Sequence, residues 1–284
     1  VYCAAAGYPP HDPRADDAAY DDIIQSATGY VDVHRRAGME ARLAPTIVVY
    51  KVAGMAIANA ITTALFRRER TGEGREITLA MNEIATAFLL VEHGSGAIPE
   101  PATGSSGYDR VLAAERRPLA TTDGLVTILA YERHQFEGLA RIGGRDDLLA
   151  DDRFRTRLGR LQHIDELYSE YRTIAAGFDT QAFLIACRAN GVPVHRVVDL
   201  DEVIADLPLA DHPVAGTYRV LPGLVPTGVD LVGDDGPTGP RIAAPLVGQD
   251  GREILASLGY GDGEIESLVE RAVIGEPSQV RTSP

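Results

Sequence analysis

The sequence contains no tryptophan, a single lysine (Lys51) and only two cysteines among its 284 residues. Cys3 and Cys187 lie far apart in apolar surroundings, which is typical of small buried residues in a reducing compartment rather than of a disulfide. Arginine supplies nearly all the positive charge, yet the formal net charge is −14. Because no basic stripe offsets this acidity, nucleic acid is not expected as a partner.

No signal peptide is visible in residues 1–20, because they lack a basic start and an apolar run. We therefore expect a cytoplasmic protein. Residues 46–66 approach the length that spans a bilayer, but they include Lys51, Asn59 and three threonines, and much of their apolar content is alanine. The stretch predicts a buried helix of a soluble protein, and no membrane partner is expected.

The stretch from Pro45 to Ala80 organises the first part of the chain. Small and apolar residues such as Val52, Met55 and Asn59 recur at helical steps of three and four, which predicts a long helix packed on most of its circumference. An arginine cluster and then Gly72 end this helix. A short strand over 76–80 and a helix over 81–92 are predicted to follow.

The chain opens with VYCAAAG, which is typical of a buried strand in a parallel sheet. No cap or turn precedes it, so we expect that material upstream of residue 1 is missing. A short helix is predicted over 18–30, and irregular structure over 31–44.

The second half of the chain begins after a loop rich in glycine and proline, Gly94–Gly107. Asp123-Gly124 between two short apolar runs, 119–122 and 125–129, predicts a hairpin. Further helices are predicted over 133–143, 161–175, 180–189, 200–205, 251–258 and 263–272, with a short strand after Gly191 and a disordered tail over 275–284.

The run FRRERTGEG, which follows an apolar small-residue helix and precedes a short strand and Met81, resembles the family III CoA-transferases, or CaiB/BaiF family. Other landmarks agree in order and spacing, namely AYDDIIQSATGY, GSSG at 104–107, RRPLATTDGLVTI at 116–128 and PLVGQDGREILASLGY. RxRTGxG alone is a weak signal, whereas the ordered set is specific and covers nearly the whole chain.

The resemblance implies an α/β fold in which a split Rossmann-like large domain carries an inserted smaller α+β domain, and in which two subunits interlock as a homodimer. The large domain would lack the family's N-terminal portion, which would leave an open sheet edge. The implied divisions are a large domain at 1–100, a linker with a glycine loop at 101–117, a small domain at 118–206, a return linker at 207–244 and returning C-terminal helices at 245–284.

The resemblance also implies a reaction, the exchange of coenzyme A between an acyl-CoA and a small free carboxylic acid, with no metal. In the family, an aspartate attacks the thioester to give a mixed anhydride, and the released CoA thiolate then forms an aspartyl-CoA thioester. That aspartate lies four residues before a glycine at the start of the long helix. Counted back from Gly54, its position in this chain holds Tyr50.

Tyr50 leaves two functions open. A phenol, with a pKa of about 10, is a poor nucleophile unless it is activated, and the side chain of the neighbouring Lys51 diverges from it on a helix. The chain is therefore either an acyl-CoA:carboxylate CoA-transferase or a catalytically silent CoA-thioester-binding homologue or partner subunit. An acyl-CoA racemase is less favoured, because the family's racemase histidine and aspartate positions hold Tyr20 and Tyr50.

The remaining candidates have both a structural and a functional interpretation. Met81 matches an apolar contact to adenine, but a core methionine would look the same. One glycine-containing segment corresponds to the family loop that closes over the active aspartate, but it could equally be an ordinary linker. Its residues are Gly104, Ser105, Ser106 and Gly107. Asp21 and Asp22 are adjacent and so lie on different helix faces. The histidines show no metal-ligand spacing.

Overall fold

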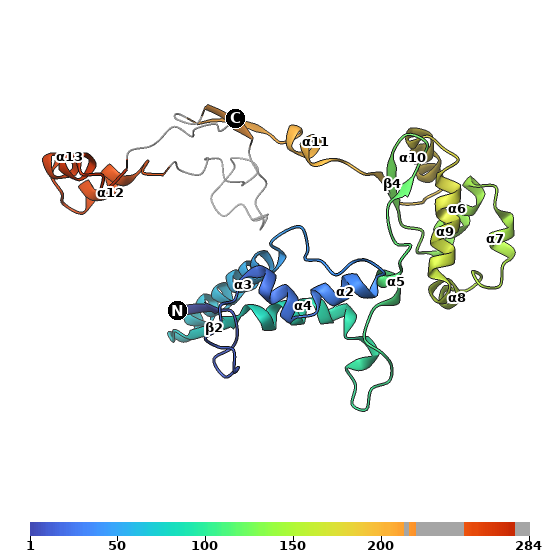
Figure 1. Ribbon diagram of the computed structural model, residues 1–284, viewed down its shortest axis with the longest axis horizontal. Coiled ribbons are helices and arrows are strands. Elements are labelled where there is room, and N and C mark those ends of the chain that lie inside the picture. Colours follow the sequence, from blue (N-terminus) through green and yellow to red (C-terminus); the bar gives the residue numbers. More distant parts are fainter. Residues whose placement is uncertain (213–215, 220–246, 276–284) are drawn as a thin grey trace. The chain divides into compact units, whose positions relative to one another are not determined.

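The computed structural model describes residues 1–212, 216–219 and 247–275 (Figure 1). The chain divides into two compact units, Val1–Val197 and Val198–Pro284. Most of the predicted return linker and the predicted disordered tail lie outside the described residues.

The first unit begins with a parallel pair of strands, β1 (Tyr2–Ala6) and β2 (Glu76–Ala80), in the register Tyr2↔Glu76 to Ala6↔Ala80. Both strands were expected from the sequence, and the parallel pairing of β1 is confirmed. The predicted burial of β1 is wrong, because its residues are exposed or partly exposed in a sheet of only two strands. The helices and turns of this part are α1 (Asp21–Ala27), α2 (Tyr30–Arg36), α3 (Val48–Thr71), α4 (Met81–His93), the 3₁₀ turn η1 (Ser95–Ala97) and α5 (Asp109–Leu112).

The prediction of irregular structure over 31–44 is wrong at its start, where α2 forms. Gly29 has a φ of 95°, which lets the chain turn sharply between α1 and α2. Within α2, Asp32 pairs with Arg35 and Arg36 one turn later, and these guanidinium groups hold the pKa of its carboxyl below the usual range. An acidic residue followed three and four residues later by arginines stabilises a helix, and this spacing is visible in the sequence.

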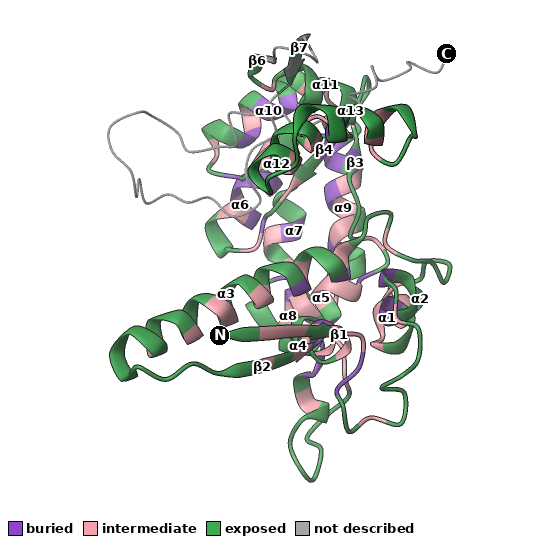
Figure 2. Ribbon diagram, turned by 90° about the vertical axis from the view of Figure 1, so that its left-hand side faces the viewer, coloured by how far each residue is buried: buried purple, intermediate pink, exposed green. Residues whose placement is uncertain are grey.

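Helix α3 confirms the predicted length but not the predicted burial. It runs over 24 residues and ends at Gly72, whose φ of 76° is the left-handed value expected of a C-terminal cap. Of its residues only Val49 and Ala53 are buried, and Figure 2 shows most of the helix as exposed. The sheet of β1 and β2 has only two strands, so it offers little surface against which α3 can pack. By length and composition this helix could also cross a membrane. One helix that meets this criterion is only weak evidence for a membrane span.

The later part of the first unit has a hydrophobic core of its own, separate from a small cluster around Ile24 and Val49. We call this larger core the second core. Here β3 (Leu119–Ala120), β4 (Leu125–Ile128) and β5 (Val194–Arg196) form an antiparallel sheet in that order. The helices are α6 (Arg133–Ile142), α7 (Asp146–Ala150), α8 (Arg157–Gln162), α9 (Ile164–Ala175) and α10 (Thr180–Ala189). The predicted hairpin and the helix over 180–189 are confirmed, whereas the predicted helix over 161–175 is interrupted at His163.

Aromatic side chains fill this second core. Phe154 and Phe183 are fully buried, and Phe136 meets Phe154 edge to face at 6.4 Å between ring centroids. Cys187 lies in the same core, where burial raises the pKa of its thiol to about 11, and both cysteines of the chain are free. A thiol in this setting is structural rather than reactive.

The second unit contains short elements. They are α11 (Leu200–Ala205), the antiparallel pair β6 (Leu209–His212) and β7 (Gly216–Arg219), α12 (Gly251–Ser257) and α13 (Asp262–Glu270). Asp199 accepts a hydrogen bond from the backbone of Glu202 and thereby caps α11. The first unit, Val1–Val197, holds most of both predicted domains, so the domain bounds and the return of the C-terminal helices to a large domain stay predictions.

Candidate functional site

Tyr50 lies in the first turn of α3, and its side chain is 39% exposed. Its backbone N–H donates a hydrogen bond of 3.0 Å to Oδ1 of Asp21. The ammonium group of Lys51 donates to Oγ1 of Thr46 at 2.6 Å. Lys51 therefore has a hydroxyl partner of its own, and nothing in its geometry supports activation of the Tyr50 phenol.

Asp21 anchors the start of α3 from α1. Its side chain is only 3% exposed, and its second oxygen accepts a 2.6 Å hydrogen bond from Nε2 of Gln25. Gln25 is itself fully buried and accepts from the backbone N–H of Ala44 at 2.8 Å. Because α3 has no side-chain cap from its own N-cap residue, the carboxylate supplied by α1 satisfies a donor that would otherwise be orphaned.

The predicted separation of Asp21 and Asp22 onto different faces is confirmed, since Asp22 is exposed. The role of Asp21 was missed by reading the sequence. A signal did exist, because Asp21 and Gln25 are spaced i, i+4 and can hydrogen bond on one helix face. Its partner at Tyr50 could not be found from the sequence, because the contact joins two elements that are far apart in the chain.

Met81 and Tyr20 lie near this end of the helices. Met81 is partly buried against a small cluster of Tyr8, Ile24, Val49 and Ala85, so it packs beside the first turn of α3. Tyr20 is the N-cap of α1, directly before Asp21, and its side chain is 68% exposed. Three of the predicted site residues, Tyr20, Tyr50 and Met81, are thus carried by elements that meet around Asp21.

The glycine loop lies at the other end of α4. Gly107 donates its N–H to the carbonyl of His93, the last residue of α4, at 2.8 Å. Oγ of Ser106 accepts from Arg36 at 2.9 Å. Since Met81 begins α4 and His93 ends it, a rise of 1.5 Å per residue separates them by roughly 18 Å. The structure therefore does not bring the loop together with Tyr50.

The loop itself is closed by its backbone. Gly104 donates to the carbonyl of Gly96 at 3.0 Å, and a side chain at Gly96 would collide with Gly104, whose Cα would lie 2.7 Å from the added Cβ. Ser105 is exposed at the tip of this segment. Beside it, a shallow cavity of about 140 Å³ is lined by residues that include Arg36, His93 and Ser106.

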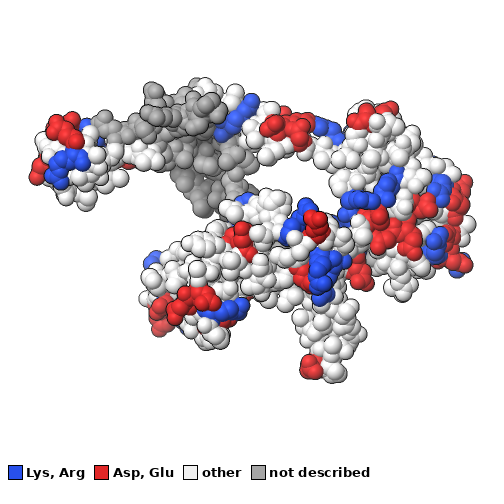
Figure 3. Space-filling model, in the orientation of Figure 1, with Lys and Arg blue, Asp and Glu red and all other residues white. Residues whose placement is uncertain are grey.

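The charges of the chain are mixed rather than gathered. On the face in Figure 3, acidic and basic side chains are interspersed over the part that holds the second core. Within the described ranges, no group of three or more His, Cys, Asp or Glu side chains is placed to hold a metal ion.

Comparisons with known proteins agree with this fold. The chain is 26% identical over 249 residues to a succinate–glutarate CoA-transferase of Agrobacterium fabrum, covering 87% of this chain and 58% of that protein. It is 27% identical over 214 residues to an acetyl-CoA:oxalate CoA-transferase of Acetobacter aceti, covering 73% and 54%. The chain thus spans less than two thirds of the length of these relatives.

A solved structure of a CaiB/BaiF family protein from Brucella suis is similar to this fold with a TM-score of 0.66 at 22% identity, over 91% of this chain and 68% of that one. The mixed α/β fold expected from the resemblance is confirmed by this likeness. The sequence profile of CoA-transferase family III matches residues 1–251. By this match the chain belongs to CoA-transferase family III.

Proposed function

We propose that the protein takes part in acyl-CoA:carboxylate CoA transfer, with small dicarboxylic acids as acceptors. The observation that carries this proposal is the family match over 1–251, which includes the glycine-rich turn after α3 and the start of α4. The dicarboxylate class is suggested by the relatives, one named for succinate and glutarate and one for oxalate. We further propose that the active form is a homodimer.

The reaction sets a clear demand on the residue at the start of α3. A nucleophilic oxygen must bond to the thioester carbonyl carbon while the carbon–sulfur bond breaks and CoA leaves as a thiolate. A carboxylate does this without losing a proton and gives an anhydride that the thiolate can attack in turn. Tyr50 would have to lose its phenolic proton first and would give an aryl ester.

A specific observation favours a second candidate, a protein that binds CoA thioesters without transferring CoA. The carboxylate that contacts Tyr50 belongs to Asp21, which is only 3% exposed. Each of its oxygens already accepts a hydrogen bond. It therefore cannot replace the missing nucleophile without unfolding the start of α3. The CoA-binding fold would be kept while the transfer step is lost.

The two functions are separated by Tyr50→Asp in the full-length protein. If the site is placed correctly, the variant gains exchange of labelled CoA between an acyl-CoA and a dicarboxylic acid, and hydroxylamine cleaves the trapped acyl-enzyme or CoA-enzyme intermediate. The wild type should bind CoA, seen as thermal stabilisation.

Tyr260→Asp is a matched control, because Tyr260 is also an exposed tyrosine but lies in the second unit. It should gain no exchange. If Tyr50→Asp gains none either, the placement of the nucleophile at position 50 is wrong. Rapid exchange by the wild type would instead exclude the silent-binder function.

A further inference from the structure

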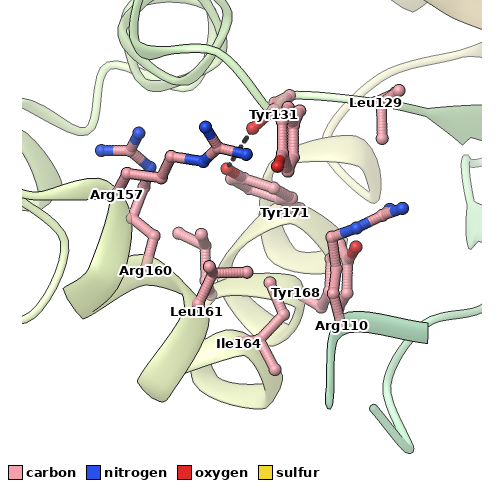
Figure 4. Close-up of a pocket in the computed structure, with 11 residues that line it drawn as sticks. Arg110, Leu129, Tyr131, Arg157, Arg160, Leu161, Ile164, Tyr168 and Tyr171 are labelled. Atoms are coloured by element: carbon pink, nitrogen blue, oxygen red, sulfur yellow. Dashed lines mark hydrogen bonds between the residues drawn. The ribbon is translucent and has the colours of Figure 1, made fainter. Parts of the chain in front are cut away.

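A small pocket in the first unit, distinct in its residues from the Tyr50 region, is built from four segments of the chain. Arg110 comes from α5, Leu129 to Tyr131 follow β4, and the remaining wall comes from α8 and α9, including Arg157 and Tyr168 (Figure 4). Its floor is apolar, with Leu161, Ile164 and Leu167.

Two arginines of this pocket lack the partner that most arginines of the chain have. Nearby, Arg153 pairs with Asp151 at 2.7 Å and Arg155 with Asp152 at 3.2 Å. Arg110 and Arg157 have no carboxylate within ion-pair distance in the part of the chain that the structure describes. In a protein of net charge −14, the pocket thus gathers two guanidinium groups that have no carboxylate partner.

Neutral tyrosines hold these guanidinium groups instead. Both lie against the ring of Tyr131, with Cζ of Arg157 at 4.6 Å and Cζ of Arg110 at 5.4 Å from its centroid. In Figure 4 they approach Tyr131 from opposite sides of the view. Nε of Arg110 also donates to the hydroxyl of Tyr108 at 3.1 Å. These contacts orient the guanidinium groups without neutralising them, so each keeps N–H donors and a full charge for an anion.

Two other polar groups of the pocket are already used. Arg160 is buried and donates to the carbonyl of Phe154 at 3.1 Å. The hydroxyl of Tyr171 donates to the carbonyl of Ala130 at 3.4 Å, and burial raises its pKa. Both are therefore structural, whereas Arg110 and Arg157 keep N–H donors that are open to a ligand.

The space limits what can bind. The pocket has a volume of about 30 Å³, enough for one small polar group. It shares Arg110, Leu129 and Tyr168 with an adjoining groove of about 450 Å³. That groove is lined by apolar Leu119 and Ile128 and also by basic side chains at its rim. A ligand with a charged head and a short hydrocarbon body fits this combination.

We propose that this pocket binds a small aliphatic carboxylate, with its head group held by Arg110 and Arg157 and its body in the adjoining groove. Planar guanidinium groups match the geometry of a carboxylate, and charge-assisted hydrogen bonds are the strong ones. The site uses no residue of the proposed CoA-transfer machinery. It therefore goes beyond the proposed function and would bind a free acid in the absence of any CoA thioester.

The test is calorimetric titration of the full-length protein with glutarate, without CoA, for the wild type, Arg157→Gln and Arg110→Gln. Loss of one charge-assisted pair should weaken binding about tenfold or more. Arg155→Gln is the matched control, because it removes the same charge two residues from Arg157 but lies outside the pocket. It should change the affinity less than threefold. Arg157→Lys, which keeps the charge but loses the planar fork, should fall in between.

Several outcomes of the titrations would overturn the proposal. They include no saturable binding of glutarate, equal weakening by Arg155→Gln, and full affinity in both pocket variants. Titration with glutaramide, which has no charge, should give no binding, and equal affinity for it would remove the role of the arginines. Inorganic phosphate serves as a last arm, because tighter binding of phosphate than of glutarate would reject the carboxylate and assign the pocket to phosphate. Since exchange of CoA is not measured, failure here leaves the proposed transfer reaction untouched.

Discussion

The carboxylate of Asp21 joins two elements through a pair of hydrogen bonds, one to the side chain of Gln25 on its own helix and one to the backbone of Tyr50. A buried acceptor of this kind matters mainly because of what its removal leaves behind. The fully buried amide of Gln25 and the partly buried N–H of Tyr50 would both lose their partner.

Asp21→Ala should therefore lower the free energy of unfolding by about 1–3 kcal/mol. The neighbour Asp22 provides the control, since its side chain is exposed and Asp22→Ala should stay within about 0.5 kcal/mol of the wild type. Urea unfolding of both variants measures the difference. Equal effects would mean that the buried contact to Tyr50 does not form in solution.

Asp123 gives a pH-dependent prediction. Its Oδ1 accepts from the N–H of Thr180 at 2.8 Å and from the hydroxyl of Thr180 at 2.7 Å, and these bonds, the hydroxyl foremost, hold the pKa of its carboxyl below the ordinary value. Since the folded pKa is the lower one, the contribution is present above the unfolded pKa of about 3.9. It is lost as the pH falls through the folded pKa.

The stability difference between the wild type and Asp123→Ala should thus be constant near neutral pH and shrink in acid. Urea unfolding from neutral pH down to about pH 3 would show this. A difference that stays unchanged over the whole range would mean that the charge of Asp123 plays no part in holding the hairpin turn to α10.

At the scale of residues, sequence reasoning identified positions better than their surroundings. Tyr50 and Met81 were placed correctly at the starts of α3 and α4. The buried state of Asp21 and the tyrosine-held arginines Arg110 and Arg157 were not foreseen. Each of these depends on contacts between segments that are distant in the chain, and no local pattern encodes such contacts.

Helices α6 and α10 approach closely at a glycine. A Cβ added at Gly138 would lie 2.6 Å from the backbone carbonyl oxygen of Asn190, at the end of α10. In an open helix, replacing glycine by alanine is favourable by roughly 1 kcal/mol. At Gly138 the collision with backbone should outweigh this gain.

We expect Gly138→Ala to destabilise the protein by about 1–3 kcal/mol. Gly54→Ala is the matched control, because Gly54 also lies inside a helix but a Cβ there would meet nothing within 4 Å. It should stabilise by up to about 1 kcal/mol. Thermal unfolding of both variants measures the two signs, and a stabilising Gly138→Ala would show that α6 and α10 are not packed this tightly.

At the scale of elements, periodicity and turn residues predicted most of the helices and strands. The helix over 180–189 and the hairpin around Asp123-Gly124 follow from local rules and were found. The exposure of α3 did not follow from its sequence. The helical spacing of small and apolar residues indicates which surface a helix can bury. Whether that surface is buried depends on the neighbouring elements.

For the whole molecule, the exposed side of α3 is a surface on which association can be tested. A groove of about 490 Å³ runs along this helix, lined by small residues such as Ala56, Ala60 and Ala64 and by Ile77 of β2. Asn59, Thr63, Arg67 and Arg75 also line the groove. An apolar centre with polar and charged residues around it favours association. We therefore expect the 284-residue chain to self-associate at micromolar concentration.

Sedimentation velocity over a range of concentrations would measure this association. Ala60→Glu, which places a charge in the groove, should shift the chain toward the monomer. Ala186→Glu would serve as the control, because Ala186 lies on α10, away from the groove residues. A chain that is monomeric at every concentration would mean that the groove is not an association surface.

The pairing of β1 with β2 also bears on the order of folding. Tyr2 must find Glu76, so the first strand cannot pair until the whole of α3 has left the ribosome, and closing so long a loop costs entropy that few contacts of the two-stranded sheet repay. The hairpin of β3 and β4 closes across only four residues, whereas β5 joins β4 from nearly as far along the chain as β2 lies from β1. The β3–β4 hairpin is therefore expected to form before either β1 joins β2 or β5 joins β4.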